Sequence, residues 1–360
     1  MKYSFRQKLG AAIYDLPRLV WSVRPSSRHP WLYVRNREEH LTVDESTSGV
    51  RCDWRWTSDL HVAMVYPTLG RTLMKRALRD WPIKFEAEPF SPNGSVRVSF
   101  IIGHRGLERL PHLILTLQSI AAQRDVVLEC IVVEQSCKPE IREHLPSWVR
   151  YVHTCLPHAD MPYSRAWAFN VGARRARGEL LLLHDNDMLV TENYAFELFL
   201  RFGEGYEVIN LKRFIFYLTE AHSTELLHGR AKILDESPES VVQNLEAGGS
   251  VGVSREAYFA IGGFDESFVG WGGEDNEFWE RAQTRSVWPY SYLPIIHLWH
   301  SPQPGKLNEA RATARLFQAR TAVPADIRIR ELVQRGFGNS LSPPQVGTRT
   351  GVGGQAGSQA

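Results

Sequence analysis

The middle of the chain alternates short apolar runs with segments in which apolar residues recur at helical spacing. The apolar runs at 96–102, 128–133 and 180–183 predict buried strands. Helical spacing over 113–120, and a serine placed to cap a helix over 164–176, predict the intervening helices. This order predicts an α/β domain whose mostly parallel sheet has right-handed crossovers.

Weaker patterns surround this core and suggest the domain boundaries. Further elements are expected as a helix near 194–201, a strand near 208–217, a glycine-rich strand at 248–253, a short helix from Arg255, and charged helices at 306–317 and 326–335. The last twenty or so residues are Gly, Ser, Gln and Thr with little to bury, which predicts disorder. The predicted organisation is an accessory region at 1–95, the main domain at 96–305, a helical extension at 306–337 and a disordered tail at 338–360.

The first 95 residues are rich in Trp, Arg and Pro and show little clean periodicity. Ala11 to Val23 predicts an amphipathic helix interrupted at Pro17. Thr68 to Trp81 predicts a helix that is basic on one face. That helix either docks on the main domain, which we favour, or binds a membrane surface or a partner. Because the region has tryptophans to bury and no phosphate-binding glycine loop, we expect it to pack against the main domain.

Composition narrows the class of protein and its compartment. Of the 360 residues, 43% are apolar and 23% charged, as in a well-packed globular protein, and the net charge of +2 does not suggest a nucleic-acid partner. The four cysteines form no CxxC pair, so we expect reduced thiols and a cytoplasmic protein. Neither an apolar run of about 20 residues nor a signal-peptide pattern is visible, so membrane contact would be peripheral, at the cytoplasmic face.

Polar side chains follow the predicted strands at the point where each strand ends. His104 and Arg105 follow the first strand, Glu134 the second, and Asp185-Asn186-Asp187 the third. Ligands of parallel sheets bind beyond the carboxyl ends of the strands. Two carboxylates at a strand end suit a hard divalent cation such as Mg²⁺ or Mn²⁺. The alternative is an Asx turn that merely ends the strand.

A second candidate cluster is His297-Leu-Trp-His300, which follows an apolar run. Two histidines three residues apart can share a face and bind one metal ion through neutral imidazoles. Taken alone, the pair is more simply explained as histidines that hydrogen-bond to backbone. The acidic triplet and the histidine pair support each other as parts of one metal site.

The third candidate is the string Gly270-Trp-Gly-Gly-Glu-Asp-Asn-Glu277. Glycines around Trp271 allow a tight, mobile loop. Glu274 and Asp275 enter an expected helix at 276–282. An aromatic ring beside carboxylates suits a sugar, since the ring covers C–H surface and the acids bind hydroxyls. The alternative is a helix N-terminus with favourable acidic residues.

These motifs together resemble the GT-A glycosyltransferases. The segments VSFIIGHRG, CIVVEQS, YSRAWAFNVGARRARGELLLLHDNDM and GGFDESFVGWGGEDNEFWERA occur in the family's order and spacing. They are most similar to the β-1,4-galactosyltransferase and chondroitin-polymerase type, with its WGGED motif. The resemblance covers residues 96–301 and implies a GT-A fold, a nucleotide-sugar donor whose nucleotide is UDP, and a glycan or other hydroxyl acceptor.

For the donor, the resemblance implies five contacts. Arg105 corresponds to a residue that helps hold the nucleotide, and Glu134 corresponds to a position near the nucleobase. Arg165 corresponds to an arginine that faces the donor, and Asn170 lies in the same motif. Asp185 would lie near the ribose or the donor sugar.

For the metal and the chemistry, the resemblance implies further roles. Asp187, His297 and His300 would bind Mn²⁺ or Mg²⁺. Asp275 would be the catalytic base and Glu274 an acid that binds the acceptor. Trp271 would lie at the donor and acceptor sugars, on the mobile loop that includes Gly272 and Gly273.

The expected activity is a metal-dependent inverting transfer to an acceptor hydroxyl, in the synthesis of a surface polysaccharide. The chain departs from the family where Gly103-His104-Arg105-Gly106 replaces Pro-Phe-Arg-Asn, and where Asn276 replaces a third acid. Two alternatives stay open. A retaining enzyme like the polypeptide GalNAc-transferases has a similar loop, but with Asn in place of Asp275. A non-catalytic nucleotide-sugar-binding module is the other.

Overall fold

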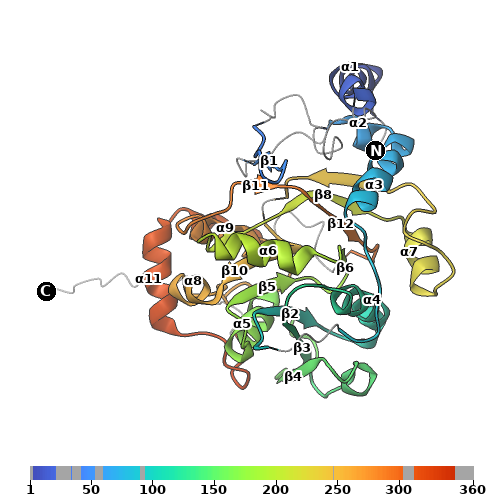
Figure 1. Cartoon of the computed structure of the whole chain (residues 1–360). Coiled ribbons are helices and arrows are strands. Elements are labelled where there is room, and N and C mark those ends of the chain that lie inside the picture. The colour runs from blue at the N-terminus through green and yellow to red at the C-terminus, as the bar shows by residue number, and fades with distance from the viewer. Residues whose placement is uncertain are drawn as a thin grey trace, which may run out of the picture.

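A computed structural model describes residues 3–21, 34, 42–52, 60–89, 94–245, 247–302 and 312–344. The described part contains two main sheets with helices packed around them (Figure 1). The first sheet has the order β4-β3-β2-β5-β10-β7. Its strands are β2 (Val98–His104), β3 (Leu128–Ser136), β4 (Arg150–Cys155), β5 (Leu180–His184), β7 (Val208–Ile209) and β10 (Ser250–Ser254). Strands β2, β3 and β5 are parallel, as predicted, and β4, which was not predicted, runs parallel to β3. Strand β10 runs antiparallel to both β5 and β7.

The alternation of side chains along the strands separates two hydrophobic cores. Phe100 and Leu182 face one core, and their neighbours Ile101 and Leu183 face the other. Because successive side chains of a strand point to opposite faces, the continuous apolar runs mark a sheet buried on both sides. Helix α4 (Leu110–Ala121) packs in the first core and α5 (Arg165–Arg175) in the second. The predicted cap of α5 is confirmed, since the Trp167 backbone N–H donates to Ser164 Oγ.

A second sheet, with the order β6-β12-β8-β9, lies beside the first. Its strands are β6 (Met188–Val190), β8 (Lys212–Tyr217), β9 (Ser240–Gln243) and β12 (Leu293–His297). The single strand predicted over 208–217 is wrong, because β7 belongs to the first sheet and β8 to the second. The strand is interrupted at Asn210. The side-chain Oδ1 of Asn210 accepts from the Lys212 backbone N–H, and its side-chain amide donates to the Leu245 carbonyl. These side-chain hydrogen bonds replace the backbone pairing of a strand at this position.

The described N-terminal residues form α1 (Phe5–Trp21), β1 (Val50–Arg51), α2 (Val62–Val65) and α3 (Pro67–Asp80), and β1 pairs with β11 (Tyr290–Ser291). Two of these helices, α2 and α3, pack on the second sheet, and α1 packs on α2. Helix α1 begins earlier than predicted and includes Pro17. Helix α3 buries Leu73 and Met74, so it docks on the domain, as we favoured from the sequence. No helix of the described residues has the length and apolar character to cross a bilayer.

The remaining helices complete the fold around the sheets. They are η2 (Leu107–Arg109), η3 (Arg142–His144), α6 (Tyr194–Gly203), α7 (Glu220–Leu227), α8 (Arg255–Ala260), α9 (Glu274–Ala282), α10 (Ala312–Thr321) and α11 (Ala325–Arg335). Helices α10 and α11 pack on α9 and are held there by ion pairs such as that of Arg328 with Glu277 (2.8 Å). None of the four cysteines forms a disulfide.

The C-terminal residues were predicted to be helical at 306–317 and disordered from 338. The first part of that helix, 306–311, lies outside the described residues, as does 345–360. At the start of the predicted tail, the Gly338 backbone N–H donates to Glu266 (2.7 Å). The Asn339 carbonyl accepts from the Trp167 indole (2.8 Å). The first residues after 338 are therefore attached to the domain.

Candidate active site

A cavity of about 900 Å³ opens at the carboxyl ends of β2 and β5 and extends to the end of β12. All but four of the residues predicted for the site line this one cavity: Arg105, Arg165, Asp185, Asp187, Trp271, Glu274, Asp275, His297 and His300. Residues more than a hundred positions apart in sequence thus face a common space. Two chemically different clusters of side chains lie along its wall, and different strands and helices position each of them.

The first cluster combines Asp187 with the two histidines. Strand β12 pairs antiparallel with β6, which places His297 opposite Met188. The Leu298 backbone N–H donates to the Asp187 carbonyl (2.9 Å), so a backbone hydrogen bond joins the acidic triplet to the histidine motif. His297 Nε2 lies 3.8 Å from Asp187 Oδ1, and His300 Nε2 lies 3.4 Å from Asp187 Oδ2. One atom from each residue fits within 4.8 Å of the others.

The chemistry of this cluster suits a divalent metal ion. Asp187 Oδ1 is buried and has no hydrogen-bond partner within the part of the chain that is described. Burial opposes its ionisation, but His297, Arg109 and His300 hold the pKa of Asp187 below its usual value. His300 Nδ1 donates to the Ser301 carbonyl (2.7 Å), which leaves the Nε2 lone pair for a ligand. Burial also lowers the pKa of His300, which favours the neutral, metal-binding form.

The second cluster is organised around Arg165 at the start of α5. Its Nε and Nη2 lie 2.8 and 2.7 Å from Asp185 Oδ1. Its Nη1 lies 3.6 Å from Glu274 and 3.9 Å from Asp275. Burial works against the charge of Arg165, yet these three carboxylates raise its pKa above the ordinary value. Arg165 therefore links the acidic triplet to the acid pair of the glycine loop.

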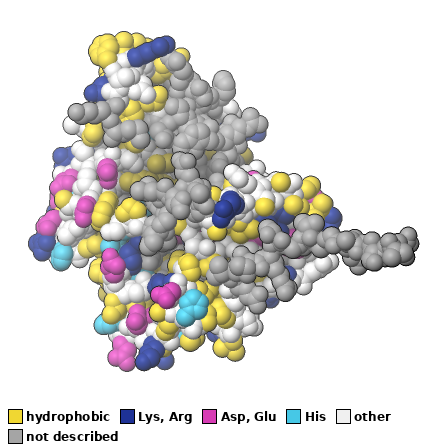
Figure 2. Space-filling view, turned by 180° about the vertical axis from the view of Figure 1, so that it is seen from behind, with side chains coloured by type: hydrophobic (Ala, Val, Ile, Leu, Met, Phe, Trp, Pro, Cys, Tyr) yellow, Lys and Arg dark blue, Asp and Glu magenta, His cyan; other side chains and the backbone are white. Residues whose placement is uncertain are grey.

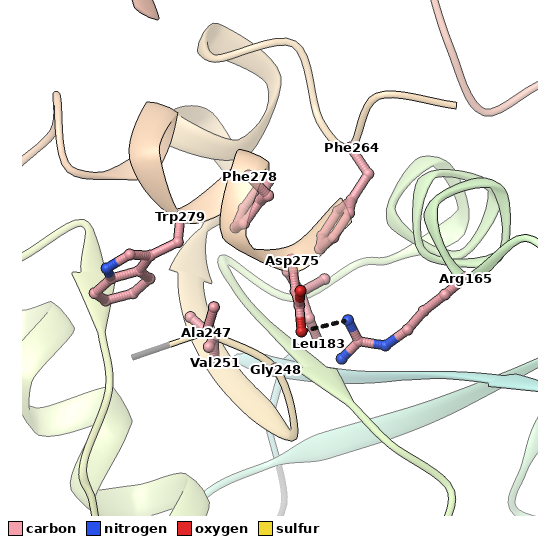
Figure 3. Close-up of a pocket in the computed structure, with 9 residues that line it drawn as sticks. All are labelled: Arg165, Leu183, Ala247, Gly248, Val251, Phe264, Asp275, Phe278 and Trp279. Atoms are coloured by element: carbon pink, nitrogen blue, oxygen red, sulfur yellow. Dashed lines mark ion pairs between the residues drawn. The ribbon is translucent and has the colours of Figure 1, made fainter. Parts of the chain in front are cut away.

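The acid pair enters the cavity through a turn that needs glycine. Gly270, Gly272 and Gly273 have φ values of 97°, 95° and 93°, which L side chains rarely adopt. Gly273 is the N-cap of α9, and Glu274 and Asp275 are the first two residues of that helix. Figure 3 shows Arg165 reaching from α5 toward Asp275.

The two acids differ in their surroundings. The Glu274 side chain is 9% exposed and that of Asp275 27% exposed. Burial and the neighbouring charge of Asp275 raise the pKa of Glu274 to about 7. Glu274 Oε2 is buried without a hydrogen-bond partner among the described residues, whereas Asp275 Oδ1 accepts from the Asn276 backbone N–H (2.9 Å). Glu274 thus has an oxygen available to bind a hydroxyl, and Asp275 is the more accessible of the two.

Four predicted residues do not line the cavity. Glu134 is buried, and its carboxylate accepts from the Ser136 hydroxyl (2.9 Å), the Glu140 backbone N–H (3.0 Å) and the Tyr151 hydroxyl. Asn170 Oδ1 accepts from the Tyr258 hydroxyl and the Phe264 backbone N–H, at 2.6 and 2.9 Å. The structure therefore gives both side chains protein partners instead of a place on the cavity wall. The other two are Gly272 and Gly273, which act through the turn.

The sequence interpretation missed several residues on the cavity wall. Arg109 of η2 donates to Asp187 and lies 3.2 Å from Asn186 Oδ1. The Tyr217 ring stacks on His297 with 4.4 Å between the ring centroids. His104, which the sequence already placed among the strand-end side chains, also lines the cavity. It donates from Nε2 to the Gly106 carbonyl and accepts at Nδ1 from Asn186, and burial lowers its pKa to about 4. A single basic residue four positions after Arg105 carries no motif, so only the fold reveals Arg109.

Comparison of the sequence with known families and proteins gives consistent matches. Residues 241–289, which contain most of β9 and all of β10, the glycine loop and α9, match the family described as the N-terminal domain of galactosyltransferase. The chain is 24% identical over 245 residues to chondroitin synthase of Escherichia coli, covering 56% of this chain and 34% of that protein. It is 27% identical over 158 residues to beta-1,4-galactosyltransferase 5 of Sus scrofa, covering 39% and 34%. The chain spans about a third of the length of these two curated relatives.

Solved structures with a similar backbone are also glycosyltransferases. One is the catalytic domain of Drosophila beta1,4galactosyltransferase 7 in complex with xylobiose, at 15% identity and a TM-score of 0.38, covering 64% of this chain and 83% of that one. Another is GalNAc-T7 with UDP, GalNAc and Mn²⁺, at 13% identity and a TM-score of 0.46, covering 65% and 50%. Neither likeness reaches a TM-score of 0.5.

The mostly parallel sheet, the cavity at its strand ends and the sequence matches make this chain similar to the glycosyltransferases, the class of enzyme to which the matched family and both curated relatives belong. Within that class, the sequences that it matches are of the galactosyltransferase and chondroitin synthase type.

Proposed function

We propose that this protein is a metal-dependent, inverting glycosyltransferase that moves a sugar from a nucleoside diphosphate donor, UDP by resemblance, to a hydroxyl of a glycan acceptor. The observation that carries the proposal is the single cavity shared by Asp187, His297 and His300 at one end and by Glu274 and Asp275 at the other. An enzyme of this kind needs a site for the diphosphate and a base for the acceptor. Both sets of residues are present in one space.

The metal end would hold the diphosphate. Asp187, His297 and His300 offer one oxygen and two nitrogen ligands, a set that suits Mn²⁺ and also accepts Mg²⁺. A bound divalent ion supplies charge neutralisation for the diphosphate leaving group. Arg105 and Arg109 line the same cavity and would add charge-assisted hydrogen bonds to phosphate oxygens.

The acid end would hold and activate the acceptor. Asp275 would take the proton of the attacking hydroxyl while the acceptor oxygen bonds to the anomeric carbon and the bond from that carbon to the diphosphate breaks. General-base assistance of this kind contributes about 10²–10⁴-fold. Glu274 Oε2, which has no hydrogen-bond partner among the described residues, would accept from a second acceptor hydroxyl. Trp271, on the glycine loop, would cover the apolar face of a sugar ring and exclude water.

Arg165 would hold the metal end and the acid end of the cavity at a fixed spacing. Its contacts with Asp185, Glu274 and Asp275 mean that one guanidinium sets the spacing between the strand end and the acid pair. It also offsets the mutual repulsion of three carboxylates in a partly dry site. Its role is positioning.

A donor screen tests the proposal. Purified protein is incubated with a panel of nucleoside diphosphate sugars, with Mn²⁺, with Mg²⁺ and with a chelator, and nucleotide release is measured. We expect release from one donor class, dependent on the metal and lost in Asp187→Asn. A growing polysaccharide at the cytoplasmic face is the acceptor to test first, given the similarity to chondroitin synthase. If nucleotide sugars bind without any turnover across the panel and acceptors, the chain is a binding module and the proposal fails.

A further inference from the structure

Helix α1 presents an apolar stripe to the outside of the molecule. Phe5, Leu9, Ile13 and Leu16 are 81%, 48%, 64% and 39% exposed. Their spacing of four, four and three residues places them along one face of the helix. Large apolar side chains exposed singly are ordinary, but four in a row on one helix face indicate a contact surface. The catalytic proposal makes no use of this surface.

The opposite side of α1 attaches the helix to the protein. Ala11 and Asp15 are 4% and 0% exposed, and the Asp15 carboxylate accepts from the Val62 backbone N–H of α2 at 2.9 Å. Figure 1 shows α1 at the end of the molecule, beyond α2 and α3. The stripe therefore points away from the domain, on a helix whose orientation is fixed by a buried contact.

The charges on α1 are arranged unevenly. Arg6 and Lys8 are exposed, and at 100° per residue they lie on either side of the apolar stripe. Asp15 is the helix's one acidic residue, and it faces inward. The outer surface of α1 is thus apolar in the middle and positive at its borders. Figure 2 shows hydrophobic and basic side chains gathered at this end of the molecule.

We propose that α1 docks the protein on the surface of an anionic lipid bilayer, with the helix lying in the headgroup region. An amphipathic helix with an apolar stripe and basic borders fits this surface, since the stripe enters the acyl boundary and the cations face lipid phosphates. A second protein fits it less well. A stable protein interface buries about 800 Å² per partner, which a stripe of four partly exposed side chains on one helix does not provide.

The test is co-sedimentation of the full chain with lipid vesicles, in the absence of nucleotide sugar and metal. One set of vesicles is an equal mixture of phosphatidylglycerol and phosphatidylcholine, and the other is phosphatidylcholine alone. The test variant is Ile13→Asp, and its matched control is Ile327→Asp, which introduces the same charge at a 44% exposed position of α11. Both sites are exposed enough that the fold should tolerate the change, which circular dichroism checks.

We expect the parent chain and Ile327→Asp to bind the anionic vesicles, with Ile13→Asp binding at least about tenfold more weakly. Arg6→Gln combined with Lys8→Gln should weaken binding to anionic vesicles and leave binding to phosphatidylcholine unchanged. Equal binding of the parent chain to both kinds of vesicle, or equal loss in the two aspartate variants, would overturn the proposal. So would a lipid-free oligomer that Ile13→Asp converts to a monomer, since the stripe would then be a subunit interface. None of these readouts depends on catalysis, so the docking proposal can fail while the proposed function stands.

Discussion

Gly248 leaves space for the carboxylate of Asp275. A Cβ built at Gly248 would lie 2.6 Å from Asp275 Oδ2, and Gly248 has a φ of +76°. The loop before β10 and the N-terminus of α9 therefore meet at the proposed base (Figure 3). Any side chain at this position must displace either the loop or the carboxylate.

Gly248→Ala should therefore impair turnover by moving Asp275. We expect kcat to fall by at least about tenfold while Mn²⁺ binding is unchanged, since a small misplacement of a catalytic group is costly. The matched control is Gly229→Ala, where φ is +69° but no atom lies within 4 Å of the added Cβ. Steady-state kinetics of the two variants separate the contact from backbone strain. Equal losses in both would mean that strain alone is responsible.

Asp187→Asn should remove the metal site and leave the fold intact. The amide keeps the shape of the carboxylate but has neither its charge nor its affinity for a hard cation. We expect Mn²⁺ affinity, measured by electron paramagnetic resonance of the free ion, to fall by at least about 10-fold to 100-fold. Asp326→Asn, whose side chain is 66% exposed on α11, should bind Mn²⁺ as the parent does. Unchanged Mn²⁺ binding by Asp187→Asn would rule out the shared site.

Glu274→Gln should change the dependence of stability on pH. Burial and Asp275 raise the pKa of Glu274 to about 7 in the folded protein, above its ordinary value of 4.5. Between these two values the folded state binds more protons than the unfolded state, so folding stability falls as pH rises through this window. Glutamine does not titrate, so the melting temperature of the variant relative to the parent should rise from pH 4 to pH 8.

The same substitution should also affect kinetics. If ionised Glu274 binds an acceptor hydroxyl, kcat/KM of the parent should rise with pH near 7, and Glu274→Gln should lose this limb. The control is Glu256→Gln on α8, an exposed acid whose replacement should leave both profiles unchanged. A parallel pH profile of melting temperature in parent and Glu274→Gln would contradict the raised pKa.

Thr313 ties the C-terminal helices to the glycine loop. Its hydroxyl donates to the Trp271 carbonyl at 2.7 Å, and Thr313 is only 5% exposed. Thr313→Val removes this bond while keeping the volume, so we expect KM for donor or acceptor to rise by up to about tenfold. Thr313→Ser keeps the hydroxyl and should retain most of the parent KM. Unchanged kinetics in the valine variant would show that the loop is held by other contacts.

The sequence predicts β2, β3, β5 and β10 of the first sheet because these strands are buried on both faces, and it misses β4, whose side chains are only partly buried. Uninterrupted apolar runs such as Leu180–Leu183 have few alternatives in a domain of this size. The second sheet was not predicted as a unit. Its strands come from separated short segments, and the split at Asn210 depends on side-chain bonding that periodicity does not detect.

The residues of the candidate site likewise divide into those that the local sequence reveals and those that only the fold reveals. Motif residues at strand ends, such as Asp187, are recognisable from local sequence, and the pairing of β6 with β12 explains why His297 joins them. Arg109 was missed because its contact with Asp187 depends on how η2 lies over the strand ends. Glu134 was expected near the nucleobase of the donor. In the structure, the loop after β3 folds back and supplies hydrogen-bond donors to its carboxylate. Long-range packing of this kind is absent from a local pattern.

The anomeric configuration of the first sugar product tests the proposed inverting reaction most directly. Proton NMR can follow the reaction of an α-linked nucleoside diphosphate sugar with acceptor or water, before the free sugar mutarotates. The account predicts that the β product appears first, and that Asp275→Asn lowers kcat by roughly 10²-fold or more with donor affinity little changed. An α product appearing first, or near-normal turnover by Asp275→Asn, would contradict it.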